Sequence, residues 1–191
     1  LSGSTASIRS TLFAGNAINS GGNFFLAEGG ALAASQSMAR ISRCAFRDNT
    51  AVSASFTPFG PVARGGAVWC DSAGLEIRSC LFEGNHAFYF GVPDPTLSKP
   101  EPGTQGGAVF GPALVTRSSF LANRATSRPE ALIARAEGGA VFGATLVSRS
   151  SFLANEVRGI GPVPDIGPAA ESAKLECCTF EANLPLALPP L

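Results

Sequence analysis

Charged residues are scarce in this sequence of 191 residues: they make up 15% of it, and 14 basic side chains balance 14 acidic ones. A chain without net charge has no long-range field to attract a polyanion, so nucleic acid and anionic membranes are poor candidate partners. No apolar run of about 18 residues occurs, and we expect no transmembrane segment. The hydrophobic share of 45% excludes a disordered linker, despite 22 Gly and 14 Pro. These values predict a single domain, 1–191, with a sizeable core.

Residues suited to metal binding or catalysis are also few. The chain has one His, His86, and its five Cys residues form no Cys-x-x-Cys motif. That is too little for a zinc site, and we expect no metal and no cofactor. An odd number of cysteines cannot pair completely within the chain, and their density is below that of a disulfide-framework protein.

An internal repeat accounts for most of the sequence. Residues 105–123 recur as 137–155, with fifteen of nineteen positions identical, and looser copies occupy 29–49 and 65–85. Each copy ends in Phe-x-x-Asn, and six such elements occur: Phe13/Asn16, Phe46/Asn49, Phe82/Asn85, Phe120/Asn123, Phe152/Asn155 and Phe180/Asn183. Ankyrin and tetratricopeptide repeats have similar periods, but they need two helices per unit. Here Gly-Gly and short β-branched runs favour strands.

Positions within the repeat have fixed chemical character. Five residues before each Phe stands an aliphatic residue, and two before it stands a small one, such as Cys44 or Cys80. The pattern predicts an inward aliphatic, a bend, and a short strand with the small residue and Phe inward. We therefore predict an all-β fold, a right-handed parallel β-helix of about six coils, with long loops on one side. Equivalent residues would form ladders about 4.8 Å apart.

Phe rings can stack in such a ladder. Asn suits a bend because it tolerates the left-handed region, and its amide can bond along the stack. Gly-Gly allows backbone angles that a Cβ would forbid.

The repeat resembles that of the chlamydial polymorphic outer membrane proteins, in which GGA followed by Val or Leu alternates with Phe-x-x-Asn. The matching segments are Gly29–Leu32, Gly65–Val68, Gly106–Val109 and Gly138–Val141, together with the six Phe-x-x-Asn elements. The resemblance implies a β-helix that acts as a surface adhesin. Departures are the Pro- and Ala-rich loops and the absence of a following translocator barrel in this sequence.

The segments between each Asn and the next Gly-Gly differ in sequence from one repeat to the next, and we expect them to be loops that bind partners. Candidate contacts are the loop aromatics Phe24, Phe25, Phe56, Phe59, Phe88, Tyr89 and Phe90. The plainer interpretation is that these aromatics fold back to cover the flank of the solenoid, but clustered aromatics are also typical of interfaces. Arg43, Arg117 and Arg149 share one repeat position; we expect them in solvent, and the alternative is a carbohydrate or carboxylate site.

Cys44 and Cys80 occupy equivalent positions in adjacent coils, so a disulfide between them is possible. The alternative is a ladder of buried thiols. Cys177 and Cys178 are neighbours and should point to opposite faces, Cys178 inward and Cys177 outward.

Enzymes that cleave polysaccharides can share this fold, but they need a cluster of carboxylates. Glu28 and Glu137 share a repeat position three coils apart, so we expect no enzyme. We expect instead a scaffold or adhesion module at the cell surface or outside the cell, bound to other proteins of a larger assembly. An intracellular structural subunit is the alternative. We also expect a fragment of a longer protein, whose further coils could stack on this one, and an extended tail at 184–191.

Overall fold

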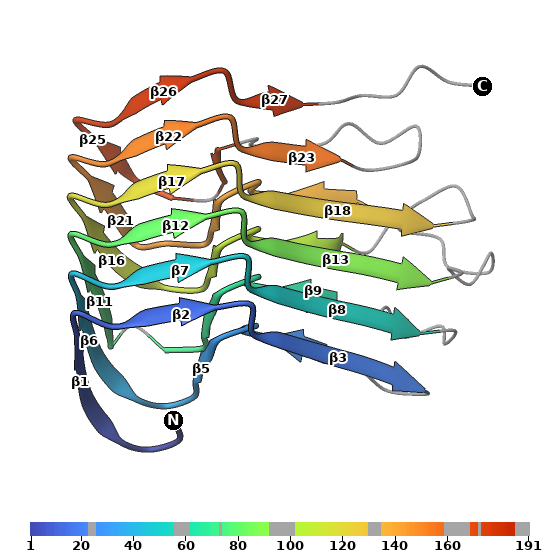
Figure 1. The fold of residues 1–191 in the computed structure, drawn as a ribbon, viewed down its shortest axis with the longest axis horizontal. Coiled ribbons are helices and arrows are strands. Elements are labelled where there is room, and N and C mark those ends of the chain that lie inside the picture. The colour runs from blue at the N-terminus through green and yellow to red at the C-terminus, as the bar shows by residue number, and fades with distance from the viewer. Residues whose placement is uncertain are drawn as a thin grey trace.

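A computed structural model of the chain describes residues 1–22, 26–55, 62–72, 74–91, 102–129, 135–158, 169–171 and 173–185. Every regular element in these residues is a β-strand, and the strands form five parallel sheets. The chain passes through the sheets in turn and then begins the next coil, which makes a parallel β-solenoid (Figure 1). The fold class that the repeat predicts is therefore confirmed.

The first and second sheets follow one another along each coil and are joined by a bend. The first sheet contains β1 (Thr5–Arg9), β6 (Met38–Ser42), β11 (Leu75–Arg78), β16 (Ala113–Thr116), β21 (Leu146–Ser148) and β25 (Leu175–Glu176). The second contains β2 (Leu12–Ala14), β7 (Ala45–Arg47), β12 (Leu81–Glu83), β17 (Ser119–Leu121), β22 (Ser151–Leu153) and β26 (Thr179–Glu181).

The third and fourth sheets come next along each coil. The third contains β3 (Ala17–Gly22), β8 (Thr50–Ser55), β13 (His86–Gly91), β18 (Arg124–Pro129), β23 (Glu156–Arg158) and β27 (Leu184–Pro185). The fourth contains β4 (Leu26–Glu28), β9 (Val62–Arg64), β14 (Pro102–Gln105) and β19 (Arg135–Glu137). Leu184–Pro185 belong to the expected tail, yet they pair with β23 and continue the stack.

The fifth sheet returns the chain toward the first. It contains β5 (Leu32–Ala34), β10 (Val68–Cys70), β15 (Val109–Phe110), β20 (Val141–Phe142) and β24 (Ala170–Glu171). In Figure 1 the second and third sheets run from left to right at the front, and the chain returns behind them while it climbs from the N-terminus. This winding is right-handed.

The number of complete coils is smaller than the expected six. Four consecutive circuits, β1–β5, β6–β10, β11–β15 and β16–β20, have a strand in all five sheets. In the part of the chain that the structure describes, the circuit from β21 to β24 lacks a strand of the fourth sheet, and the last has only β25, β26 and β27. The six Phe-x-x-Asn elements thus count incomplete circuits as well.

The core is built from the predicted ladders. Each Phe pairs in register with the Phe of the next coil, and neighbouring rings stack with centroids 4.7–5.0 Å apart. Phe46, Phe82, Phe120 and Phe152 are fully buried, whereas Phe13 in the first coil is half-buried and Phe180 in the last is 49% exposed. The aliphatic column runs in register beside them, from Ile8 to Leu175. Burial of these apolar columns drives folding.

Bends between the sheets use left-handed backbone, but the predicted role of Asn there is wrong. The positive φ belongs to the residue before each Asn, for example Asp48 (53°) and Ala122 (52°). The Asn itself turns inward, where the amides of Asn49, Asn85, Asn123 and Asn155 are fully buried. A second bend, with positive φ, lies between the first and second sheets.

The two end members of the Asn ladder, Asn16 and Asn183, differ from the four buried ones. Asn183 is only half-buried and Asn16 is exposed, because each lies in a terminal coil that has a neighbour on one side in the described residues. Asn183 nevertheless continues the ladder: its Oδ1 accepts from Asn155 Nδ2 at 2.9 Å, and its Nδ2 donates to the carbonyl oxygen of Phe152 at 3.0 Å. The bend role predicted for Asn183 is also wrong, since the positive φ (49°) belongs to Ala182. A uniform ladder would bury all six Asn side chains equally, and the structure does not.

The Gly-Gly pairs form the bend between the fourth and fifth sheets, as predicted. The first Gly of each pair has positive φ, as in Gly65 (60°). The second packs against backbone: a Cβ on Gly66 would lie 2.1 Å from the carbonyl oxygen of Gly107. No side chain fits there.

Candidate interaction surface

The predicted partner-binding aromatics that the structure describes lie on a strand, which corrects the expectation of a loop. Phe88, Tyr89 and Phe90 belong to β13 at the centre of the third sheet. Because strand side chains alternate between faces, the three do not act together. Tyr89 points inward and is buried, whereas Phe88 is half-buried and Phe90 is 48% exposed on the outer face. Phe24, Phe25, Phe56 and Phe59 lie outside the described residues.

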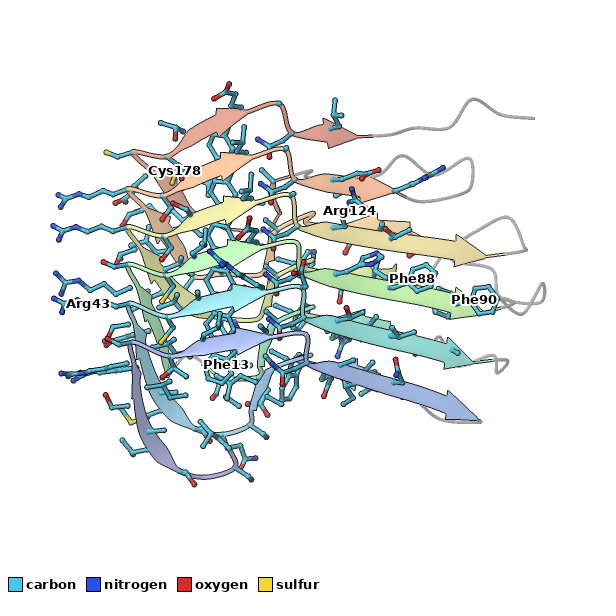
Figure 2. The ribbon with its side chains drawn as sticks, in the orientation of Figure 1. Phe13, Arg43, Phe88, Phe90, Arg124 and Cys178 are labelled. Atoms are coloured by element: carbon cyan, nitrogen blue, oxygen red, sulfur yellow. The ribbon has the colours of Figure 1, made fainter. Side chains whose placement is uncertain are left out.

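His86, Phe88 and Phe90 form a continuous patch, which we name the aromatic face. Ring centroids are 5.3 Å apart between His86 and Phe88 and 6.4 Å apart between Phe88 and Phe90. Figure 2 shows Phe88 and Phe90 along β13, with Arg124 on the strand above. His86 Nε2 lies 2.9 Å from Thr126 Oγ1, which fixes the ring at one end of the patch. Outward aromatics of this kind are typical of protein interfaces.

Small inward side chains explain why β13 can present these rings outward. The inner column of the third sheet contains Ala51, Ala87 and Ala125, all fully buried. They allow the fourth sheet to approach closely, where Gly103 leaves room for the Tyr89 ring: a Cβ on Gly103 would lie 2.6 Å from it. Burial raises the pKa of Tyr89. The third and fourth sheets therefore form a thin, closely packed extension with little space for large side chains inside.

A polar ladder crosses the fourth sheet beside the Gly-Gly bend. Arg64 contacts Glu28 through Nη1 and Oε1 at 3.4 Å and donates from Nε to Gln105 Oε1 at 3.3 Å. Gln105 Nε2 then donates to Glu137 Oε2 at 2.9 Å. Burial raises the pKa of Glu28, and the Arg64 charge opposes that rise. Glu28 and Glu137 thus share one column, as predicted, but they are joined through other side chains and do not face one another across a cleft.

Outward aromatics on the fifth sheet were missed by the sequence analysis. Trp69, Phe110 and Phe142 occupy one register column, are half-buried, and the two Phe rings stack at 5.5 Å. The Arg64 guanidinium lies 5.0 Å from the Phe110 ring centroid. The available signal was the aromatic residue that follows GGAV in three repeats. The polar ladder and the aromatic column of Trp69, Phe110 and Phe142 therefore meet at the Gly-Gly bend.

The cysteines are free in the structure, so the possible bridge between Cys44 and Cys80 is not formed. Both thiols are buried, and each lies within hydrogen-bonding distance of the carbonyl oxygen two residues earlier, at 3.3 Å for Cys44 and 3.4 Å for Cys80. The ladder of buried thiols, left open as the alternative, is what the structure contains. Cys178 packs against the core and Cys177 is exposed, as predicted.

Within the residues that the structure describes, no group of three His, Cys, Asp or Glu side chains is placed to hold a metal ion. The arginines Arg43, Arg117 and Arg149 are exposed at the bend between the first and second sheets. The outward side chains that stand out in these residues are the aromatic face, the aromatic column of Trp69, Phe110 and Phe142, and the three arginines.

The fold is a parallel β-solenoid whose outer faces carry aromatic and arginine side chains. No protein-family model matches the sequence, and the comparisons with curated proteins and with solved structures found no match. Among the residues described, no helix is long and apolar enough to cross a membrane.

Proposed function

We propose that this chain is a non-enzymatic scaffold or adhesion module of a surface or extracellular assembly, and that it binds other proteins through the segments between its repeats. The observation that carries the proposal is the aromatic face. Phe90 is 48% exposed on a strand whose opposite side already packs inside the solenoid, so the ring contributes little to the core. Large exposed aromatics stabilise a complex when a partner removes them from water.

The repeat supports the same proposal. Its GGA and Phe-x-x-Asn elements resemble those of the polymorphic outer membrane proteins, which are surface adhesins. In this chain the two elements form the Gly-Gly bends and the Phe and Asn ladders, which leaves the outer faces of the sheets free to differ between coils. A polysaccharide-active enzyme is a weaker proposal, because Glu28 and Glu137 are held apart by Arg64 and Gln105.

A second candidate is a structural subunit of an internal filamentous or organellar assembly. The observation that favours it is that all five thiols are free.

Crosslinking in cells that produce the protein tests the aromatic face. A photo-reactive amino acid at position 90 should crosslink to another protein, whereas the same group at position 114 should not. Leu114 is the matched control because it is also exposed (38%) but lies on the first sheet. Equal crosslinking from both positions, or none from position 90, would contradict binding through this face.

Labelling of Cys177 separates the two candidates. A membrane-impermeant maleimide should modify this exposed thiol in intact cells if the chain is at the surface. Modification only after cell lysis would favour the internal subunit. Cys177→Ser controls for labelling at the other thiols.

A further inference from the structure

A row of arginines runs along the bend between the first and second sheets. Five successive coils contribute one exposed arginine each: Arg9, Arg43, Arg78, Arg117 and Arg149. We name this row the arginine ridge. Figure 2 shows Arg43 pointing away from the solenoid at this edge. The sequence pattern found only three of the five, because Arg9 and Arg78 precede the bend by one residue.

The backbone fixes the base of each arginine. Strand pairing places Arg9 beside Ser42, and Ser42 beside Arg78, in neighbouring coils of the first sheet. At the bend itself, the amide N of Arg43 donates to the carbonyl oxygen of Arg78 at 3.1 Å, and that of Arg117 donates to Ser148 at 3.0 Å. Coils stack about 4.8 Å apart, so the ridge holds five guanidinium groups along about 19 Å.

In the described residues, no ion pair joins a carboxylate to an arginine of the ridge. The ion pairs that the structure contains there involve other cations, which are Arg40, Arg47, Arg64, Arg124 and Lys174.

A groove runs beside the ridge and is lined by Arg78, Arg117 and Arg149. Two carboxylates, Glu76 and Glu176, also line this groove. Each of them is already paired, Glu76 with Arg40 and Glu176 with Lys174. Like charges on adjacent strands repel one another, so the ridge would gain from an external anion.

We propose that the arginine ridge binds an acidic polysaccharide, a linear sugar chain with repeated sulfate or carboxylate groups. A guanidinium presents a planar fork of donors that matches an oxyanion. Between the arginines lie hydroxyls that can bond to sugar hydroxyls, from Ser10, Ser42, Ser79 and Ser148. The ridge is a different surface from the aromatic face, and this proposal does not depend on the proposed function.

Other polyanions fit the ridge less well. Single-stranded nucleic acid needs aromatic side chains on which its bases stack, and none lines the grooves that the structure shows here. An acidic peptide that adds a strand needs free backbone groups, but at this bend the amides bond between coils. A row one or two residues wide also presents little area to a membrane surface.

Fluorescence anisotropy with a labelled heparin-derived oligosaccharide tests the proposal on the chain of residues 1–191. We expect binding at about 50 mM salt that weakens about tenfold by about 200 mM, because charge pairs at the surface are screened. Arg43→Gln/Arg117→Gln/Arg149→Gln should weaken binding at least about tenfold. The control Arg47→Gln/Arg124→Gln/Arg158→Gln removes the same charge from the second and third sheets, and it should change the Kd less than about twofold.

A second variant keeps the test valid if the triple variant folds poorly. Arg9→Gln/Arg78→Gln leaves the left-handed positions unchanged, and it should weaken binding while the thermal unfolding curve stays the same. Failure to bind the oligosaccharide at low salt, or an equal loss in the control variant, would overturn the proposal. Tighter binding of single-stranded DNA, a polyglutamate peptide or phosphatidylserine vesicles than of the oligosaccharide would overturn it as well.

Discussion

Asn85 and Asn123, in neighbouring coils, are joined through their side-chain amides. Nδ2 of Asn85 donates to Oδ1 of Asn123 at 2.9 Å, and the backbone N of Asn85 donates to the same oxygen at 3.1 Å. Nδ2 also donates to the carbonyl oxygen of Phe46, while Oδ1 of Asn85 accepts from Asn49. The buried amide therefore has all its partners, and the ladder fixes the register between coils.

Asn85→Ala should lower the free energy of unfolding by more than about 3 kcal/mol, because it leaves several buried groups without partners, each at a cost of about 1–3 kcal/mol. Urea denaturation measures the change. Asn16→Ala is the control, since Asn16 lies at the exposed end of the same ladder and should lose less than about 1.5 kcal/mol. Equal losses would show that the ladder does not stabilise the interior in this way.

Gly66→Ala should prevent folding or destabilise the protein by more than about 4 kcal/mol. A Cβ there would lie 2.1 Å from the carbonyl oxygen of Gly107 and 2.5 Å from the backbone of His86, and backbone atoms cannot move aside singly. Gly15→Ala tests the alternative that any glycine matters: Gly15 has φ of +63° and no atom within 4 Å, so it should lose only about 1–2 kcal/mol. Thermal unfolding distinguishes the two variants.

The buried thiol of Cys70 should make stability fall at alkaline pH. Burial raises the pKa of Cys70 from 9.0 to about 12, so its neutral form is favoured in the folded protein. The stabilisation is complete below the unfolded pKa and is lost as the pH rises through 9 toward 12. Urea denaturation at about pH 8 and about pH 10.5 should therefore show a larger loss for the wild type than for Cys70→Ala.

Cys177→Ala, which changes an exposed thiol, should keep the wild-type loss. A Cys70→Ala variant with that same loss would instead assign the alkaline transition to other buried groups, such as Cys80 and Tyr89, whose pKa values burial also raises.

The repeat made the ladders predictable, because one residue type at one position in every coil becomes a column once coils stack. Phe82 and Ile77 were placed correctly for this reason. The aromatic face was not, because the position of 86–91 between Asn85 and the next Gly-Gly predicts a loop, whereas these residues form a strand on which His86, Phe88 and Phe90 alternate with inward residues. The arginine ridge was found only in part. Its members occupy two repeat positions, and only the bend brings them to one edge.

Arg64 holds the polar ladder of the fourth sheet together, so its removal should have a cost that depends on pH. It lies between Glu28 and Gln105, and the three side chains are mostly buried. Arg64→Met keeps much of the apolar stem but leaves the Glu28 carboxylate without its cation. We expect the free energy of unfolding at about pH 7 to fall by about 1–3 kcal/mol.

The pH dependence follows from the pKa of Glu28. Burial already raises this pKa above 4.5 against the opposing Arg64 charge, so loss of Arg64 should raise it further. A carboxyl whose pKa is raised on folding favours the folded state below its unfolded pKa, and that stability is lost as the pH rises through the folded pKa. The difference between Arg64→Met and the wild type should therefore be large at about pH 7 and small at about pH 4.

Two further variants decide whether Glu28 is the cause. Glu28→Gln in the Arg64→Met background removes the unpaired charge and should restore part of the stability at neutral pH. Arg47→Met breaks the exposed pair with Glu83, whose side chains are 50% and 39% exposed, and should cost less than about 1 kcal/mol. A loss for Arg64→Met that is the same at both pH values would mean that its packing on Phe110, rather than the charge of Glu28, accounts for its contribution.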